Sequence, residues 1–224
     1  AGTGLPAVLS TGMATMDEIA DALDVLAFGY TCADDNPGEK KIREVGNSAE
    51  GRAALSEKVA LLHCTTEYPT PFEDVTLRAM DSMRERFGLT TGYSDHTVGI
   101  TVSIAAVARG AQIVEKHFTT DRALPGPDHA ASLEPSELVA MVRAIRETES
   151  ALGSETKAPA HSEQKNIAIA RKSLVASCAI AEGEIFNAEN LTVKRPGNGV
   201  PPVRFWDYLG RRANRAYSPD ELID

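Results

Sequence analysis

The sequence predicts an α/β protein in which a parallel sheet is followed by a small, loop-rich module. Three observations support this prediction. Four strand-like apolar segments alternate with helix-like segments over residues 1–153, which is typical of a parallel sheet. Residues 154–170 are polar and have the composition of a linker, and residues 171–224 consist of short apolar pieces between glycine and proline turns. We therefore expect a sheet domain, a linker and a small domain with these boundaries.

The composition excludes several classes of protein. Hydrophobic residues make up 42% of the 224 residues and charged residues 25%, as in soluble globular proteins. No apolar run approaches the roughly 20 residues that cross a bilayer, and the first residues lack the pattern of a signal peptide. The net charge of −9 argues against nucleic acid as a partner. Cys32, Cys64 and Cys178 are odd in number and widely spaced, which predicts free thiols and a cytoplasmic location.

The first predicted strand–helix unit contains a turn that suits an anion. Ala7–Ser10 is the expected strand and Met16–Leu26 the helix, which Thr15 and Glu18 begin with a capping-box pattern. The small residues after Ser10 leave backbone N–H groups free at the start of the helix, where a phosphate could bind. Many such turns bind nothing.

The middle of the chain supplies the second unit. Residues 28–58 are polar, and we expect a loop or a loosely helical excursion that serves as surface or interface. Val59–Cys64 is the second predicted strand. The prolines of TTEYPTP (residues 65–71) favour a rigid turn before a helix at Val75–Phe87. His63 is out of phase with the inward positions of its strand, so we expect it to pack outward beneath a helix.

A long helix closes the sheet domain. The pattern predicts Pro135–Leu152, with Ser132 as its N-cap and Gly153 as its stop. Its apolar residues recur at helical spacing and predict a face in the core: Leu138, Met141, Val142, Ile145 and Leu152.

Two histidines follow consecutive predicted strands. Ser94 and His96 share one face of the third strand, and Glu115 and His117 share one face of the fourth, because residues two apart in a strand point the same way. The apolar run Ile100–Ala108 between them has the length of a helix. Parallel pairing would bring both imidazoles together beside carboxylates, which predicts a divalent-metal site. The alternative is that each histidine is a hydrogen-bonded structural residue.

Three contiguous motifs resemble those of the sialic acid synthase family: GYSDHT (residues 92–97), EKHFT (115–119) and GPDHAASLEP (126–135). Residues 171–224 resemble the antifreeze-like (SAF, β-clip) domain of the same enzymes. The family has a (β/α)8 TIM barrel, and four units are present here. The resemblance thus implies the C-terminal half of such a barrel followed by the SAF domain. It also implies a fragment whose activity would need the missing N-terminal half, where the family carries lysines that hold phosphoenolpyruvate.

The resemblance also implies roles for individual residues. His96 and His117 match the metal ligands, for Mn²⁺ with Mg²⁺ or Co²⁺ as alternatives. The cation would act as a Lewis acid on the aldehyde of the acceptor sugar. Glu115 and Asp128 match catalytic positions near the reacting end of the sugar and suit proton transfer or the positioning of water.

Five further residues match substrate contacts of the family. Ser10 and Ser94 correspond to contacts with phosphoenolpyruvate, and Thr66 to a contact with a phosphate or carboxylate oxygen. Tyr68 corresponds to a sugar contact, although it could simply pack on the neighbouring prolines. Arg195 of KRPG corresponds to an arginine that reaches the acetamido end of the sugar from the partner subunit, which implies a domain-swapped homodimer. Its alternative is a solvated surface arginine.

The remaining polar pair of the two strands points the other way. Asp95 and Lys116 alternate with the residues above, so a structural ion pair or a role behind the ligands suits them better.

The expected function is that of a transferase that condenses phosphoenolpyruvate with N-acetylmannosamine or a related amino sugar. The products would be phosphate and a nine-carbon 2-keto sugar acid, a nonulosonic (sialic) acid. Two alternatives remain at this point. One is a related phosphoenolpyruvate-dependent synthase that uses a phosphorylated sugar, and the other is a non-catalytic fragment of the family.

Overall fold

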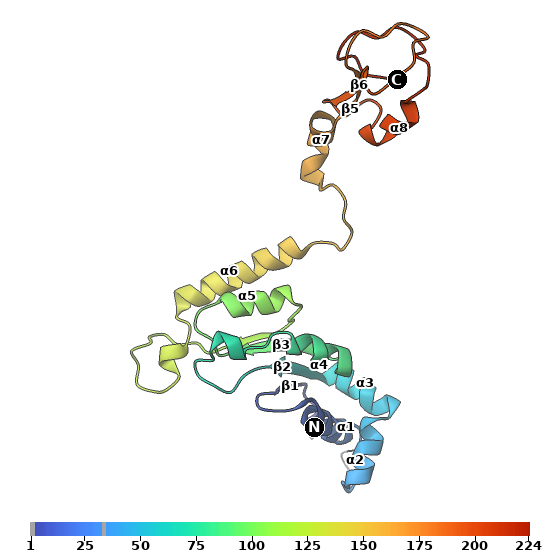
Figure 1. Cartoon of the computed structure of the whole chain (residues 1–224). Helices are drawn as coiled ribbons and strands as arrows, with labels where there is room; N and C mark the ends of the chain where they lie inside the picture. The colour runs from blue at the N-terminus through green and yellow to red at the C-terminus, as the bar shows by residue number, and fades with distance from the viewer. Residues whose placement is uncertain (1–2, 33–34) are drawn as a thin grey trace. The chain divides into compact units, whose positions relative to one another are not determined.

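The computed structural model describes residues 3–32 and 35–224. The chain forms two compact units, Ala1–Gly153 and Ser154–Asp224 (Figure 1). The first unit combines helices with a parallel sheet, and the second is built from short strands and turns.

Four parallel strands organise the first unit in the order in which they occur along the chain. They are β1 (Ala7–Ser10), β2 (Val59–His63), β3 (Thr90–Asp95) and β4 (Val114–Lys116). This half-barrel sheet confirms the predicted α/β class. Because all four strands are parallel, their carboxyl ends lie at one edge of the sheet, and the turns that follow them are brought together there.

Helix α1 (Met16–Thr31) begins as the sequence predicts but ends later. The Glu18 N–H donates to Thr15 Oγ1 at 3.3 Å and the Thr15 N–H donates to Glu18 Oε2 at 2.7 Å, so the capping box is formed. The helix continues beyond Leu26 to Thr31 because Ala27 and Phe28 are buried and extend its apolar face.

Of the two alternatives left open for residues 28–58, a loop or a loosely helical excursion, the structure has helices over most of the stretch. It contains α2 (Glu39–Gly46) and α3 (Ala49–Lys58), while residues 33–34 lie outside the described part. The hydroxyl of Ser48 accepts from the Gly51 N–H at 2.9 Å and begins α3. Helices α1, α2 and α3 pack against one another, and these tertiary contacts stabilise helices whose local sequence is polar.

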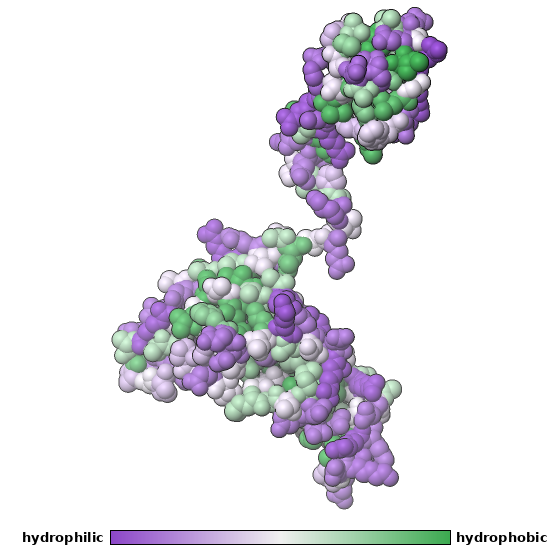
Figure 2. All heavy atoms as spheres, in the orientation of Figure 1, coloured by the Kyte–Doolittle hydropathy of each residue, from purple (hydrophilic) through white to green (hydrophobic). Residues whose placement is uncertain are grey.

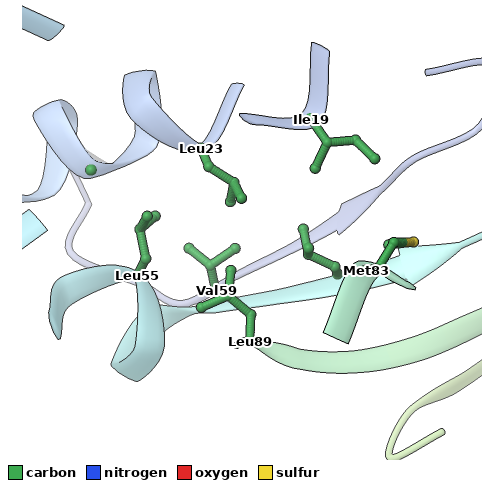
Figure 3. Close-up of a cluster of buried hydrophobic side chains, with 8 residues drawn as sticks. Ile19, Leu23, Leu55, Val59, Met83 and Leu89 are labelled. Carbon is green, nitrogen blue, oxygen red and sulfur yellow. The ribbon is translucent and has the colours of Figure 1, made fainter. Parts of the chain in front are cut away.

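A buried apolar cluster joins these helices to one face of the sheet. Figure 3 shows side chains from α1, α3 and β2 pointing toward one another together with Met83 and Leu89. The labelled members are Ile19, Leu23, Leu55, Val59, Met83 and Leu89, each at most 7% exposed. The cluster fixes the position of the first two strands and therefore of the turns at their carboxyl ends.

The predicted helix Val75–Phe87 is interrupted at its start. The structure has a 3-10 turn at Phe72–Asp74 and then α4 (Ala79–Phe87). Thr76 lies between them with a φ of 47°, in the left-handed region that an α-helix cannot contain. Helix α5 (Thr101–Ala108) follows β3, close to the predicted bounds.

Helix α6 (Pro135–Leu152) has the predicted bounds and ends at Gly153, whose φ is 55°. Its predicted cap is wrong. Glu134 is the N-cap, and its N–H donates to Glu137 Oε2 at 2.9 Å. The hydroxyl of Ser132 instead donates to the carbonyl oxygen of Asp128 at 2.7 Å.

Only part of the predicted apolar face of α6 is buried. Met141 and Ile145 lie in a core cluster with residues of α5, whereas Val142 is 45% exposed and Leu152 is 54% exposed. Val139 is 69% exposed on the same helix. Figure 2 shows an apolar patch over the region in which Figure 1 draws α5 and α6.

The first helix of the second unit lies within residues 154–170, the stretch whose composition predicts a linker. Helix α7 (His161–Ala170) precedes β5 (Ser173–Ala176), which pairs antiparallel with β6 (Leu191–Lys194). Isolated bridges, a 3-10 turn (Pro202–Arg204) and α8 (Phe205–Tyr208) complete the unit. Its core is a buried cluster of Leu174, Ala176, Ile180, Phe186, Leu191, Ala213, Tyr217 and Ile223. In the described part of the chain, no helix is both long and apolar enough to span a membrane.

A buried ion pair ties β3 to β4, on the face expected from alternation. Lys116 Nζ lies 3.2 Å from Asp95 Oδ2, with side-chain exposures of 3% and 0%. Asp95 also accepts from the Thr97 N–H at 2.9 Å, the Thr97 hydroxyl at 2.8 Å and the Ser103 hydroxyl at 2.6 Å. Burial lowers the pKa of Lys116, while the neighbouring Asp95 carboxylate acts in the opposite direction.

The buried pair should therefore respond asymmetrically to substitution. Lys116→Met should destabilise the protein by about 3–5 kcal/mol, because it leaves the Asp95 carboxylate buried without a counter-charge. Lys116→Met combined with Asp95→Asn should recover most of that loss. Thermal unfolding of the single and double variants measures both effects. A single variant as stable as the unsubstituted protein would contradict the interpretation.

Candidate functional site

A polar pocket of about 260 Å³ lies where the strands of the sheet end. Turns after all four strands contribute to it, as the parallel topology requires. Most of the residues predicted from the sequence as site residues line it. The full lining is Ser10, Gly12, Cys64, Thr66, Tyr68, Ser94, His96, Glu115 and His117.

The register of β3 and β4 places Ser94 directly opposite Glu115. The Ser94 hydroxyl donates to Glu115 Oε1 at 2.6 Å, and His96 Nε2 lies 3.2 Å from the same hydroxyl oxygen. The predicted sharing of a face by Ser94 and His96 is therefore observed. The Ser94 hydroxyl has one proton, so at any moment it can donate either to Glu115 or to a neutral His96 Nε2, but not to both.

The orientation of the His96 ring is fixed by a backbone carbonyl. His96 Nδ1 lies 2.6 Å from the carbonyl oxygen of Thr65. A carbonyl cannot donate, so Nδ1 carries a proton, and in the neutral ring Nε2 is an acceptor that lies beside the Ser94 hydroxyl. A histidine that donates one ring N–H to a backbone carbonyl and offers the other nitrogen has the usual arrangement of a metal ligand.

Tyr68 lies against both histidines. The centroid of its ring lies 4.2 Å from that of His96 and 5.1 Å from that of His117, and the two imidazoles lie 5.4 Å apart. The peptide bond between Tyr68 and Pro69 is cis. Burial raises the pKa of the Tyr68 phenol, and nearby acidic groups, including Asp128 and Glu115, add to the rise. The phenol therefore stays a neutral hydrogen-bond donor at neutral pH.

Gly12 and Cys64 line the pocket although the sequence did not single them out as site residues. A Cβ at Gly12 would lie 2.3 Å from Thr66 Oγ1 and 3.2 Å from Cys64 Sγ, so glycine is needed for the first turn to approach the second. Burial raises the pKa of the Cys64 thiol. The sequence could have predicted the place of Cys64, since Cys64 and Thr66 share a face by alternation and Thr66 was a predicted site residue. His63 points the other way, as predicted, and its Nε2 lies 2.7 Å from the Val75 carbonyl oxygen.

Two predicted site residues lie outside the pocket lining. Asp128 is exposed and precedes the 3-10 turn His129–Ala131 in the loop between β4 and α6. The negative charge of Asp128 is one of the smaller contributions to the raised pKa of the Tyr68 phenol. Arg195 lies in the second unit, where its Nε donates to the Ala170 carbonyl at 3.1 Å.

The donor set fits a cation with open coordination positions. Across the described residues, no group of three or more histidine, cysteine or acidic side chains is placed to hold a metal ion. The two imidazoles could thus supply two ligands, and water and substrate oxygens would have to supply the others. Neutral imidazole and oxygen ligands suit divalent ions of the Mn²⁺ class.

The arrangement combines groups of several chemical kinds within one small pocket. A carboxylate, two imidazoles and a phenol can orient a polyhydroxylated substrate and move protons. The turn after β1 contributes Ser10 and the closely packed Gly12. Groups of these kinds can contact a small polar molecule that has several oxygen atoms.

Comparison with known proteins gives a consistent result. The sequence pattern of the NeuB family matches residues 1–157, and that of the SAF domain matches residues 171–224. An N,N'-diacetyllegionaminic acid synthase of Campylobacter jejuni is 49% identical over 216 residues, which cover 96% of this chain and 58% of that protein. The human N-acetylneuraminate-9-phosphate synthase is 34% identical, with coverages of 98% and 55%.

A solved structure agrees with the sequence comparisons. The N-acetylneuraminic acid synthetase of Leptospira borgpetersenii, determined in complex with citrate, is 32% identical and superposes with a TM-score of 0.55. The match covers 74% of this chain and 49% of that one. The chain spans little more than half the length of the curated relatives described above. With both patterns matched in order over most of its length, the chain belongs to the NeuB family and carries its SAF domain.

Proposed function

We propose that the complete protein is a nonulosonic acid synthase. It condenses phosphoenolpyruvate with an N-acetylated amino sugar and releases phosphate and a nine-carbon 2-keto sugar acid. The observation that carries this proposal is the joint placement of His96, His117, Glu115 and Tyr68 in one pocket of a NeuB-family chain. The relatives named above are synthases of legionaminic and neuraminic acids, which supports the same class of product.

The reaction needs an activated aldehyde and a controlled proton supply. The C3 carbon of phosphoenolpyruvate forms a bond to the aldehyde carbon, and the aldehyde oxygen takes up a proton. Water then adds at C2, and loss of phosphate by C–O cleavage yields the keto acid. Glu115 lies in the pocket with its carboxylate held by Ser94, so we assign it to proton transfer at the reacting end of the sugar. Asp128 would orient water or sugar hydroxyls from its loop.

His96 and His117 would hold a divalent cation, which we propose to be Mn²⁺, with Mg²⁺ and Co²⁺ as alternatives. When bound, the cation would supply Lewis-acid polarisation of the acceptor aldehyde. The contact between His96 Nδ1 and the Thr65 carbonyl supports this assignment, because it leaves Nε2 on the side of the pocket, next to the Ser94 hydroxyl. Ser10, Ser94 and Thr66 would contact phosphoenolpyruvate, and Tyr68 would contact the sugar.

The acceptor is an N-acetylated amino sugar such as N-acetylmannosamine, or a diacetamido sugar. The identity of 49% to a diacetyllegionaminic acid synthase favours a diacetamido acceptor as the first compound to test. We place the reaction in the cytoplasm, since Cys32, Cys64 and Cys178 are all free thiols.

Product identification tests the proposed function directly. The complete natural protein, incubated with Mn²⁺, phosphoenolpyruvate and a panel of amino sugars, should form a nine-carbon keto acid that mass spectrometry detects, together with one phosphate per product. His96→Ala and His117→Ala should each abolish the product and lower the amount of bound Mn²⁺, with the fold unchanged by circular dichroism. Full metal occupancy in both variants would refute the ligand assignment, and no product from any sugar would refute the function.

We also propose that the active form is a homodimer in which Arg195 of one chain completes the sugar site of the other. The second unit is compact, and polar residues 154–160 separate α6 from α7. Such a stretch can carry a small domain onto a neighbouring subunit. An arginine from the partner would add positive charge to a chain whose net charge is −9.

A mixing experiment tests the shared site. Arg195→Ala and His117→Ala proteins should each be inactive, and the mixture should regain activity after subunit exchange. In a swapped heterodimer one site contains both defects and the other contains neither, so about a quarter of the full activity is expected when exchange is complete. If each chain served its own site, both sites of the heterodimer would stay defective. No rescue with exchange verified by mass spectrometry would rule out the swap.

A further inference from the structure

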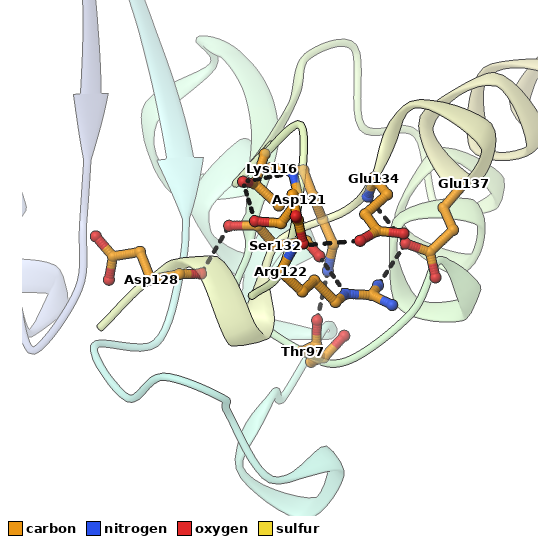
Figure 4. Close-up of polar contacts among 9 residues, drawn as sticks. Thr97, Lys116, Asp121, Arg122, Asp128, Ser132, Glu134 and Glu137 are labelled. Atoms are coloured by element: carbon orange, nitrogen blue, oxygen red, sulfur yellow. Dashed lines mark hydrogen bonds and ion pairs between the residues drawn. The ribbon is translucent and has the colours of Figure 1, made fainter. Parts of the chain in front are cut away.

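Arg122, which has no role in the reaction proposed above, holds the loop between β4 and α6 through hydrogen bonds. Residues 119–132 leave the sheet after β4 and return to it, because the Thr119 N–H donates to the Leu133 carbonyl at 2.9 Å and the Leu133 N–H donates to the His117 carbonyl at 2.9 Å. This closed loop carries Asp128. Figure 4 shows Arg122 extending toward Glu137, with the carboxyl of Asp128 on the opposite side of the cluster.

Arg122 makes contacts with both the loop and the start of α6. Its Nε donates to the Ser132 carbonyl at 3.0 Å, and one terminal nitrogen of its guanidinium pairs with Glu137. Its backbone N–H donates to Glu134 Oε1 at 3.1 Å. A planar guanidinium with donors in fixed directions can satisfy a carbonyl and a carboxylate at once, which a lysine cannot do in the same geometry.

The contacts continue from Arg122 to the residue that carries the proposed catalytic carboxylate. Ser132 is 2% exposed, and while its carbonyl accepts from Arg122, its hydroxyl donates to the Asp128 carbonyl at 2.7 Å. A path of hydrogen bonds therefore runs from Glu137 through Arg122 and Ser132 to the backbone of Asp128. The side chain of Asp128 itself is left free of this path.

Other contacts hold the ends of the loop but do not replace this path. Thr119 is 4% exposed, and its hydroxyl oxygen lies 2.7 Å from His129 Nδ1. Asp121 Oδ1 accepts from the Ala123 N–H at 2.7 Å, which closes a local turn. These bonds lie within the loop. Among the contacts of Arg122, only those to Glu134 and Glu137 join the loop to α6, which is fixed by the core.

We propose that Arg122 is a positioning residue, which acts through Ser132 to hold Asp128 in its position in the loop between β4 and α6. The proposal rests on the proposed function only in the role of Asp128. A displacement of about 1 Å at a reacting group can lower a rate about 10²-fold. Loss of the Arg122 contacts should therefore have a measurable effect on the reaction rate. Arg122 does not need to touch the substrate.

The test compares three variants of the complete protein. Arg122→Met removes the guanidinium, whereas Arg122→Lys keeps the positive charge but lacks the planar group with its several donors. Ser132→Ala removes only the hydroxyl that donates to the Asp128 carbonyl. The matched control is Arg146→Met on α6. Arg146 also donates to a carboxylate, that of Glu149 at 2.9 and 2.7 Å, but its side chain is 71% exposed and it lies far along the chain from the loop.

Amide hydrogen exchange measures how strongly Arg122 stabilises the loop, and the measurement does not depend on catalytic activity. Arg122→Met should speed exchange in residues 119–132 by about 10-fold or more, since hydrogen bonds to charged groups are lost, while exchange in α6 and β3 stays unchanged. Ser132→Ala should speed exchange only around Asp128. Arg146→Met should change neither. Equal exchange in the loop of Arg122→Met and of the unsubstituted protein would overturn the proposal.

Steady-state kinetics then separates positioning from general support. Arg122→Met and Ser132→Ala should lower kcat/KM for the amino sugar by about 10–100-fold, with the KM for phosphoenolpyruvate within about twofold and the bound metal unchanged. The kcat/KM of Arg122→Lys for the amino sugar should lie between the values of Arg122→Met and of the unsubstituted protein. Loss of stability without this difference between the substrates would mean a merely structural arginine. Absence of synthase activity in the unsubstituted protein would refute the proposed function, and the exchange comparison would still decide whether the loop is fastened by Arg122.

Discussion

The pocket depends on the register between β3 and β4. With Ser94 opposite Glu115 and Asp95 opposite Lys116, one residue pair faces the pocket and the next faces the helices. A slip of one strand by a single residue would exchange the two faces of that strand and bury a pocket residue without a partner. The ion pair between Asp95 and Lys116 joins residues that lie opposite each other in the observed register. It therefore favours this register, beyond whatever it adds to stability.

The parts of the structure that the sequence predicts correctly depend on short-range rules. Alternation along a strand places Ser94 with His96, and a three-residue spacing places Glu18 against Thr15 at the start of α1. Parallel pairing of consecutive strands then brings His117 to His96, since the helix between them returns the chain to the same edge. Each of these inferences needs only neighbours along the chain or in the adjacent strand.

The parts that were predicted wrongly or left open depend on contacts between distant segments. Helices α2 and α3 have polar sequences and are stabilised by packing against α1, which no local pattern of residues 28–58 reveals. The carbonyl of Thr65, which fixes the ring of His96, lies 31 positions away along the chain. Ser132 looks like a helix cap by position, but the nearby Asp128 carbonyl takes its hydroxyl. The local sequence allows several hydrogen-bond partners for such a side chain, and the tertiary structure determines which of them it contacts.

The charge of the pocket constrains any account of how it binds an anionic substrate. Its lining contains Glu115, and Asp128 lies close enough to influence Tyr68, whereas no lysine or arginine is among the described lining residues. A phosphoester would be repelled here unless positive charge were added locally. In the function proposed above, a cation on His96 and His117 and Arg195 of a partner chain would supply such charge. Under that proposal metal binding, substrate binding and assembly would be linked by electrostatics, because each added positive charge lowers the cost of bringing a phosphate beside these carboxylates.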